Sequence, residues 1–531
     1  MRARSQGAPG LSGKCERAAF RPLARCRGAP KPIEYVKVCS IYGAGFFYIP
    51  GTDSCIKIGG WVRAEYAFQS GNSDVPFVIG GDGRNNRIDT RDSAFRARWV
   101  TSVDIRTQTE YGTLRAYSRA GFQTTTGETT QGRIYTERGF IQFAGFTFGK
   151  SQSYFDFFGG AFCYGCGYLS NSSQTGAAGT LLAAYTATFG NGFTATLSIE
   201  DGSMRRGGVW DAGTDALAIG AYPGPSTLAD SYNFSPISTG DSGANSVPDI
   251  VGSLRVDQAW GSAQIAGALH QVRGGYYGGT LANPPTATSF VGPGGWTGLA
   301  PSDKWGWAAM GGLVLNIPWN KGDKIWVEGT VGSGTLGYAG QSSVVGTTNT
   351  FQRFNGGNVA AAWALDAVFA NAIPAAAGSL GATGATGLQL TRFWEIAGAV
   401  EHYWTPALRT DVFASYTAVD FNDTATAIFC ASPVGPVRTA AGATPSFATG
   451  PVIGCNPDYN LFNVGARTIW NPAPQFDIGL EVFYTRLETK FDPATVLLSF
   501  AGSGGRAGGN YVPSSENVWS SILRFQRNFW P

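Results

Sequence analysis

A two-residue alternation of apolar and polar side chains, clearest between residues 93 and 106, most limits what this chain can fold into. One face of the segment is largely apolar and consists of Phe95, Ala97, Trp99, Thr101, Val103 and Ile105. The other face is charged or polar and consists of Arg96, Arg98, Ser102, Asp104 and Arg106, with Val100 as the one apolar residue. Successive side chains of a strand point to opposite faces, so the segment predicts a β-strand with one apolar and one charged face.

The composition is typical of an extended β-protein that repeats this alternation. The chain has 75 glycines, 13% aromatic residues and only 14% charged residues, against roughly 25% charged residues in an ordinary soluble domain. The longest apolar stretch, 359–380, is interrupted by Asp366, Asn371 and Pro374, and a membrane helix needs about 18 or more uninterrupted apolar residues. A chain that crosses a membrane without such helices must form a closed barrel, because lipid cannot satisfy an open sheet edge.

Sixteen segments carry the strand pattern. We expect strands at 56–68, 93–106, 111–119, 137–144, 146–154, 181–189, 193–200, 250–260, 262–272, 305–317, 324–337, 390–404, 408–421, 459–470, 476–487 and 518–529. An even number of antiparallel strands of about ten residues is what a bacterial outer-membrane barrel requires.

The connections between these segments alternate strictly between short turns and long loops, as they do in outer-membrane barrels. The long loops lie at 69–92, 120–136, 155–180, 201–249, 273–304, 338–389, 422–458 and 488–517. The apolar stretch 360–370 would break this alternation as a wall strand, so we place it outside the wall; a pair of extra strands, giving eighteen, is the lesser alternative. The predicted fold is all-β: a sixteen-stranded antiparallel transmembrane β-barrel with short periplasmic turns and long extracellular loops.

Several motifs resemble one known family. They read KPIEYVKVC at 31–39, YGAGFFYIPGTDSC at 42–55, IKIGGWVR at 56–63, EYGTLR at 110–115, FIQFAGFTFG at 140–149, FDFF at 155–158 and HYWTPALRT at 402–410. In this order and spacing they resemble the alphaproteobacterial porin family of the rhizobial and Brucella type, from about residue 32 to the end. The resemblance implies a homotrimer in the outer membrane of a Gram-negative bacterium, with a third long loop folded into the barrel as a constriction.

The amino-terminal residues differ from the rest of the chain. Residues 1–31 are rich in Arg, Pro, Gly and Ala, and they lack the apolar core of about 7–15 residues that a secretory signal needs. We expect an atypical leader or a disordered arm there, and one barrel domain over 32–531.

The spacing of the cysteines supports three local pairs among the eight cysteines of the chain. The candidates are Cys39 with Cys55, Cys163 with Cys166, and Cys430 with Cys455. A zinc site at Cys163 and Cys166 would need a second nearby pair of ligands, which the sequence lacks. Disulfides formed in an oxidising compartment fit better, and no metal is expected.

Seven arginines of the first four predicted strands fall on the inward face, and we call them the arginine wall. They are Arg63, Arg96, Arg98, Arg106, Arg115, Arg119 and Arg138. So many like charges are costly in a dry core but tolerable in a water-filled lumen. The alternative is the solvated face of a soluble sheet.

The resemblance places the constriction loop, residues 155–179, opposite the arginine wall. Asp156 is the acidic residue expected there, whereas the alternation predicts that Glu137 points outward. Arginines facing Asp156 would give a transverse field, and pores select by diameter and by such charged linings. The alternative for Asp156 is a carboxylate that caps a turn. Because the loop carries so few carboxylates, the net selectivity of the pore leans toward anions, but the sequence leaves ion selectivity open.

The sequence therefore predicts a porin that forms a water-filled channel for passive diffusion of ions and small hydrophilic solutes. It is surrounded by outer-membrane lipids and needs no cofactor. A net charge of +3 without a basic run argues against a nucleic-acid partner.

Two other functions stay open. A substrate-specific channel for sugars or organic acids would need a ladder of lumen aromatics, and Trp61, Tyr117, Trp326 and Tyr403 are too scattered to establish one. A surface adhesin would use the long loops.

We expect no enzyme. An acyl hydrolase would need a histidine near a serine. Of the two histidines, only His270 is expected on the inward face of the barrel, so an outer-membrane phospholipase that uses His270 stays conceivable.

Overall fold

The structure, a computed structural model, describes most of the chain. The described residues are 37–68, 93–127, 132–157, 162–164, 175, 178–211, 242–243, 246–275, 300–340, 350–370, 386–431, 437–439, 453–500 and 508–529. The expected leader or arm at 1–31 lies outside the described residues.

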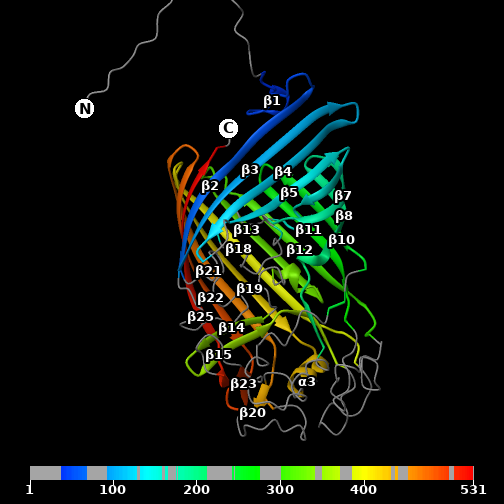
Figure 1. The fold of residues 1–531 in the computed structure, drawn as a ribbon, viewed down its shortest axis with the longest axis vertical. Coiled ribbons are helices and arrows are strands. Elements are labelled where there is room, and N and C mark those ends of the chain that lie inside the picture. The colour runs from blue at the N-terminus through cyan, green and yellow to red at the C-terminus, as the bar shows by residue number, and fades with distance from the viewer. Residues whose placement is uncertain are drawn as a thin grey trace, which may run out of the picture.

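Sixteen long strands form one closed antiparallel sheet (Figure 1). They are β2 (Ser54–Phe68), β3 (Ser93–Thr109), β4 (Gly112–Thr125), β5 (Arg133–Phe143), β6 (Phe146–Ser151), β7 (Thr180–Gly190), β8 (Phe193–Glu200), β10 (Asp249–Gln258), β11 (Gly261–Val272), β12 (Lys304–Asn316), β13 (Lys324–Ser333), β18 (Arg392–Thr405), β19 (Leu408–Asp420), β21 (Tyr459–Ala473), β22 (Phe476–Thr489) and β25 (Glu516–Asn528). Each strand pairs with the next, and β25 returns to β2 in a register that runs from Trp61 opposite Asn528 to Phe68 opposite Ser521. The predicted sixteen-stranded barrel is confirmed. A short strand, β1 (Phe47–Tyr48), also pairs with β2.

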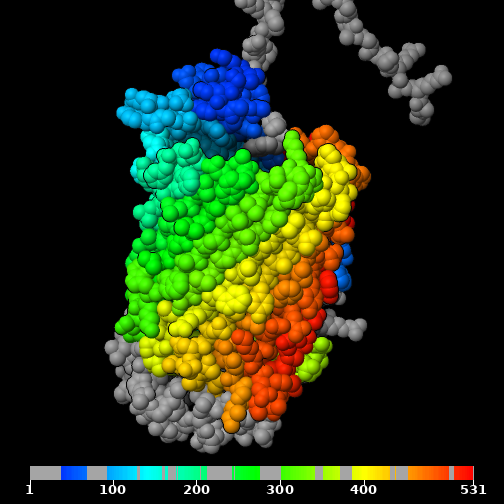
Figure 2. Space-filling view, turned by 180° about the vertical axis from the view of Figure 1, so that it is seen from behind, coloured from blue at the N-terminus to red at the C-terminus, as the bar shows by residue number. Residues whose placement is uncertain are grey.

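The barrel is apolar outside and polar inside. On β3, Phe95 and Trp99 are 64% and 52% exposed on the outer face, whereas Arg96 on the inner face is 6% exposed. Figure 2 shows the strands running obliquely across this outer wall in chain order. Aromatic residues near strand ends also face outward, namely Tyr66, Trp260, Trp394, Trp404, Trp470 and Phe529. This arrangement is the inverse of a soluble domain and suits a barrel that contacts lipid.

The short turns lie at one end of the barrel, together with β1 and the end of β25 (Figure 1). The turn between β7 and β8 shows how tightly these connections are built. Asn191 and Gly192 both have positive φ, of 49° and 75°, as the favoured two-residue hairpin turns require. A Cβ atom at Gly192 would lie 1.9 Å from the carbonyl oxygen of Asp257, so only glycine fits there.

The opposite end carries a structure that we call the cap, formed by the long loops (Figure 1). Its larger sheet has five strands, β14 (Thr350–Asn355), β15 (Asn358–Trp363), β20 (Val437–Thr439), β23 (Val496–Phe500) and β24 (Gly509–Pro513). A second sheet joins β9 (Gly208–Asp211), β16 (Leu365–Phe369) and β17 (Gln389–Leu390). The helix α3 (Asp423–Ala431) and the short 3₁₀ helices η3 (Gly202–Met204) and η5 (Leu336–Ala339) also lie in these loops, whereas η1 (Ser40–Tyr42) precedes β1.

The cap has an apolar core. The ring of Trp363 packs 5.5 Å from that of Phe429 and 5.8 Å from that of Phe491. The apolar stretch 360–370 forms β15 and β16 of the cap, so it is not part of the barrel wall, as expected. Three long loops are thus packed together at this end of the barrel. Among the described residues, no helix has the length and apolar character to span a membrane.

Candidate pore lining and constriction loop

The arginine wall lies on the inner face of β2, β3, β4 and β5, as the alternation predicts. The backbone register forms three cross-strand pairs, which are Arg63 with Arg98, Arg106 with Arg115, and Arg119 with Arg138. Like charges placed directly opposite each other destabilise a sheet unless a counter-charge lies nearby. Each arginine pair is therefore expected to need a carboxylate or another partner nearby.

Asp104 balances the pair of Arg106 and Arg115. Nε and Nη2 of Arg106 donate to its two oxygens at 3.1 and 2.8 Å, and the same atoms of Arg115 donate at 3.0 Å each. Both contacts are bidentate, the strongest geometry between arginine and a carboxylate. One carboxylate therefore orients two guanidinium groups along the lumen.

Glu137 balances the pair of Arg119 and Arg138, so the prediction that it points outward is wrong. The pairing of β4 and β5 passes from Arg119 opposite Arg138 to Ala120 opposite Thr136, which leaves Glu137 as an extra residue. Such a bulge shifts the alternation of side chains by one position. Glu137 is consequently 2% exposed, with Oε2 lying 2.7 Å from Nε of Arg119.

Glu65 lies where the barrel closes. Its carboxylate accepts from Nε of Arg96 on β3 at 2.6 Å and from Nε of Arg524 on β25 at 2.5 Å. The side chain of Glu65 is 1% exposed. A buried carboxylate thus ties the last strand of the barrel to the first two.

The described residues of the constriction loop lie inside the barrel. Phe162 stacks on Trp326 of β13 with a centroid distance of 5.9 Å, and the ring of Tyr164 lies 3.6 Å from Cζ of Arg524 on β25. The described parts of this loop therefore reach from β6 across the lumen to strands far away in the barrel. The inward-folded loop that the resemblance implied is confirmed.

Asp156 lies in a buried ion pair. Its carboxylate accepts from Nη2 of Arg205 and from the hydroxyl of Thr175. Burial raises the pKa of Asp156, although Arg205 opposes that shift. The guanidinium of Arg205 is itself held over the ring of Tyr338, with Cζ 4.5 Å from the ring centroid. Asp156 therefore faces a cation of the fourth long loop, and its predicted part in a transverse field stays a prediction.

The structure joins Cys39 to Cys55 and Cys430 to Cys455 by disulfides. Cys163 is also disulfide-bonded, and its expected partner Cys166 lies outside the described residues. The first disulfide holds the segment before β2 and the second anchors α3 in the cap.

His270 lies inside the barrel at its capped end. Its Nδ1 lies 2.6 Å from Oδ1 of Asp249, and its Nε2 lies 4.0 Å from Oδ2 of Asp366 in β16. The imidazole is packed between two carboxylates and is only 1% exposed. Among the residues that the structure describes, no three His, Cys, Asp or Glu side chains come together as a metal site.

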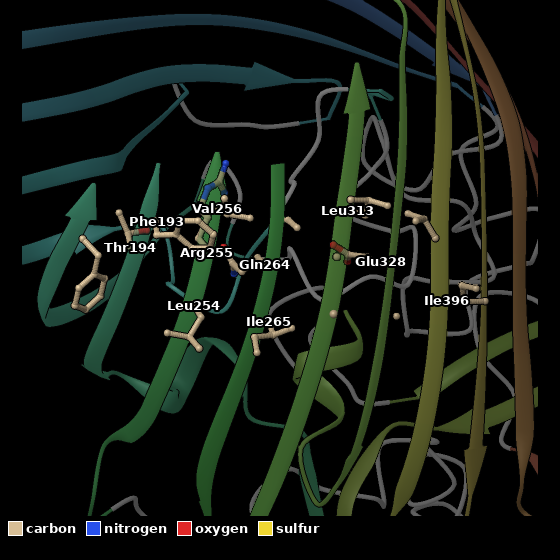
Figure 3. A pocket seen from close by; sticks show the side chains of 16 residues that line it. Phe193, Thr194, Leu254, Arg255, Val256, Gln264, Ile265, Leu313, Glu328 and Ile396 are labelled. Atoms are coloured by element: carbon tan, nitrogen blue, oxygen red, sulfur yellow. The ribbon is translucent and has the colours of Figure 1, made fainter. Parts of the chain in front are cut away.

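An apolar groove of about 560 Å³ lies on the outer face of β7, β8, β10, β11, β12, β13 and β18. Figure 3 shows Phe193, Leu254 and Ile265 projecting from neighbouring strands along it. Gly311 and Gly329 are opposite each other in the sheet and form part of the lining. This groove opens to the outside of the barrel and is separate from the arginine wall.

The sequence model of the porin subfamily matches residues 26–498. The chain belongs to the porin family. Family membership together with the closed barrel places this porin in the outer membrane.

Among curated proteins, the porin is similar to porin Omp2b of Brucella suis biovar 1 (strain 1330), with 30% identity over 255 residues, and to porin Omp2b of Brucella neotomae, with 31% identity over 255 residues. Each match covers 45% of this chain and 57% of the relative's own length. Among solved structures, the outer membrane channel DcaP of Acinetobacter baumannii covers 91% of this chain, and 99% of DcaP is matched, with 13% identity and a TM-score of 0.51. That likeness concerns the fold alone, and it agrees with the barrel described above.

The sequence pattern did not predict some of the residues that face the lumen. Arg524 has the same inward parity in the last strand as Arg63 has in the first, so barrel closure alone would have added it to the arginine wall. The ion pair of Asp156 with Arg205 had no signal, because 49 residues separate the partners and Arg205 lies in a loop.

Proposed function

We propose that the porin forms a water-filled channel for passive diffusion of ions and small hydrophilic solutes. The observation that carries the proposal is the position of the arginine wall on the inner face of a closed barrel whose outer face is apolar. Charged guanidinium groups need water or counter-charges. The guanidinium groups of the arginine wall point toward the lumen, and several of them are partly exposed there. Side-chain exposure of Arg106, Arg115 and Arg119 is 28%, 27% and 33%.

The arginine wall would line the passage, with the constriction loop narrowing it. Outer-membrane lipids would cover the outward face, including the apolar groove. The family resemblance supports a homotrimer. No catalytic step is part of the proposal, since the imidazole of His270 is enclosed by Asp249 and Asp366.

Liposome swelling with sugars of increasing size tests the diffusion channel. We expect swelling rates that fall steadily with solute size and do not saturate with concentration. Saturable uptake confined to one sugar or organic acid would support the substrate-specific alternative instead. No swelling with a folded barrel, recognised by its heat-dependent shift on an unboiled gel, would contradict the proposal and favour a surface-binding role.

A further inference from the structure

Two of the three cross-strand arginine pairs have a carboxylate of their own, and the third does not. Asp104 and Glu137 serve the first two pairs, as described above. The carboxylate nearest to the third pair is that of Glu65, whose Oε1 lies 3.9 Å from Nη1 of Arg63. That carboxylate is already engaged by the closer guanidinium groups of Arg96 and Arg524.

Neutral side chains hold the third pair instead. Nε of Arg63 donates to Oε1 of Gln526 at 2.8 Å. Nε and Nη2 of Arg98 donate to Oε1 of Gln123 at 3.0 and 2.8 Å. An amide oxygen fixes the direction of a guanidinium group but brings no negative charge. The charge of this pair is therefore left without a carboxylate of its own among the described residues.

The guanidinium group of each arginine in this pair lies over an aromatic ring. Cζ of Arg63 lies 4.0 Å from the ring centroid of Trp61, and Cζ of Arg98 lies 5.2 Å from that of Tyr135. Gly121 makes room for the second ring, because a Cβ atom there would lie 2.4 Å from Cζ of Tyr135. Stacking of this kind restrains a guanidinium group and leaves its N–H edge available.

The hydroxyl of Tyr135 adds a further unused donor. Within the described part of the chain it is buried and has no hydrogen-bond partner. A buried hydroxyl without a partner is costly, so such groups usually have a partner from the protein, water or a ligand. It belongs to the residue whose ring stacks under Arg98, so the same cluster combines excess positive charge with an unsatisfied donor.

The constriction loop brings little negative charge to this pair. Asp156 is the single acidic residue of the constriction loop, and no Asp or Glu follows it until Glu200. Its carboxylate is engaged by Arg205. The loop thus offers no other carboxylate that could compensate Arg63 and Arg98.

We propose that Arg63, Arg98 and the hydroxyl of Tyr135 form an anion-binding site on the pore wall for small oxyanions, either phosphate or a carboxylate. The guanidinium groups supply charge and paired N–H donors, the geometry that phosphate and carboxylate oxygens accept best. The site rests on the proposed diffusion channel, since the solute reaches it through the water of the lumen. It makes the third pair equivalent to the other two, with the solute in the place of Asp104 or Glu137.

The test is calorimetric titration of inorganic phosphate into the refolded porin in detergent at constant ionic strength. We expect saturable binding to the wild type. Gln123→Glu places a carboxylate of nearly the same shape beside Arg98, so phosphate binding should weaken about tenfold or more. The matched control is Gln142→Glu, which adds the same charge beside Arg115, where Nη1 donates to Oε1 of Gln142 at 3.0 Å. That pair already has Asp104, so binding should stay within a few-fold of the wild type.

Folding of each variant is checked by its heat-dependent shift on a gel, and Arg98→Gln serves as a second variant that should also lose binding. Absent phosphate binding in the wild type, or equal loss in both glutamate variants, would overturn the site. Bilayer conductance separates this result from the channel proposal. Conductance without phosphate binding leaves the channel standing, whereas phosphate binding without conductance contradicts the channel and keeps the site.

Discussion

At the residue scale, the carboxylates that face the inside of this barrel are shared between elements. Glu65 contacts guanidinium groups of two other strands, and Asp104 contacts two guanidinium groups at once. Asp366 does the same for the loops, because it accepts from the backbone N–H of Leu336 at 2.7 Å and from that of Gly207 at 2.5 Å. Each of these side chains contacts at least one element other than its own strand, so its loss should destabilise more than that strand.

Asp366→Asn should remove a pH dependence of stability. Burial raises the pKa of Asp366 from 3.8 to about 6, so the folded protein disfavours its ionised form. The stabilisation from its protonation is complete below its ordinary pKa and is lost as pH rises through about 6, a change of roughly 3 kcal/mol. The wild type should therefore gain thermal stability relative to the variant as pH falls from 7 to 4. A difference in melting temperature that stays constant with pH would contradict this assignment.

At the element scale, the two-residue period located all sixteen strands because every wall strand separates an apolar outside from a polar inside. Strand ends were less predictable. The expected strand at 324–337 stops at Ser333, where Gly334 has a φ of +68° and η5 follows. The bulge at Glu137 was invisible to a strict alternation, since an inserted residue leaves no distinctive side chain in the sequence.

The seam between β2 and β25 gives a prediction at this scale. Glu65→Gln leaves Arg96 and Arg524 buried without their carboxylate, which should lower the free energy of unfolding by about 3–5 kcal/mol. Heating followed by an unboiled gel should show the folded band disappearing at a lower temperature. The control is Glu488→Gln, because Arg486 and Glu488 are 41% and 35% exposed and such a pair contributes at most about 1 kcal/mol. Equal effects of the two changes would contradict the role given to Glu65.

At the scale of the whole molecule, the barrel could be predicted from the sequence and the cap could not. The wall strands pair with their neighbours in the chain, so local pattern and order are enough. The cap depends on parallel pairings between distant segments, such as β15 with β24 and β9 with β16. Its apolar stretches carry no sign of their partners, and the same limit applies to Asp156 and Arg205.

The disulfide between Cys430 and Cys455 should stabilise the cap without affecting the barrel. It closes a loop with a sequence separation of 25 residues, for which the chain-entropy model gives about 3 kcal/mol. The double variant Cys430→Ser, Cys455→Ser should be cut faster by proteases in the long loops while keeping its heat-dependent gel shift. Replacing Cys39 and Cys55 by serine is the control, because those residues lie at the other end of the barrel. Identical digestion of the two double variants would contradict this assignment.

Conductance across a planar lipid bilayer, with a salt gradient of potassium chloride, tests the central claim most directly. A porin with an arginine wall and a single engaged carboxylate in its constriction loop should give stepwise ohmic openings. Its reversal potential should have the sign of chloride preference, and that preference should weaken as salt rises and screens the wall. A folded barrel that gives no openings would contradict the channel. A reversal potential of the opposite sign would contradict the expectation that the arginine wall, and not the carboxylates of the lumen, sets the ion preference.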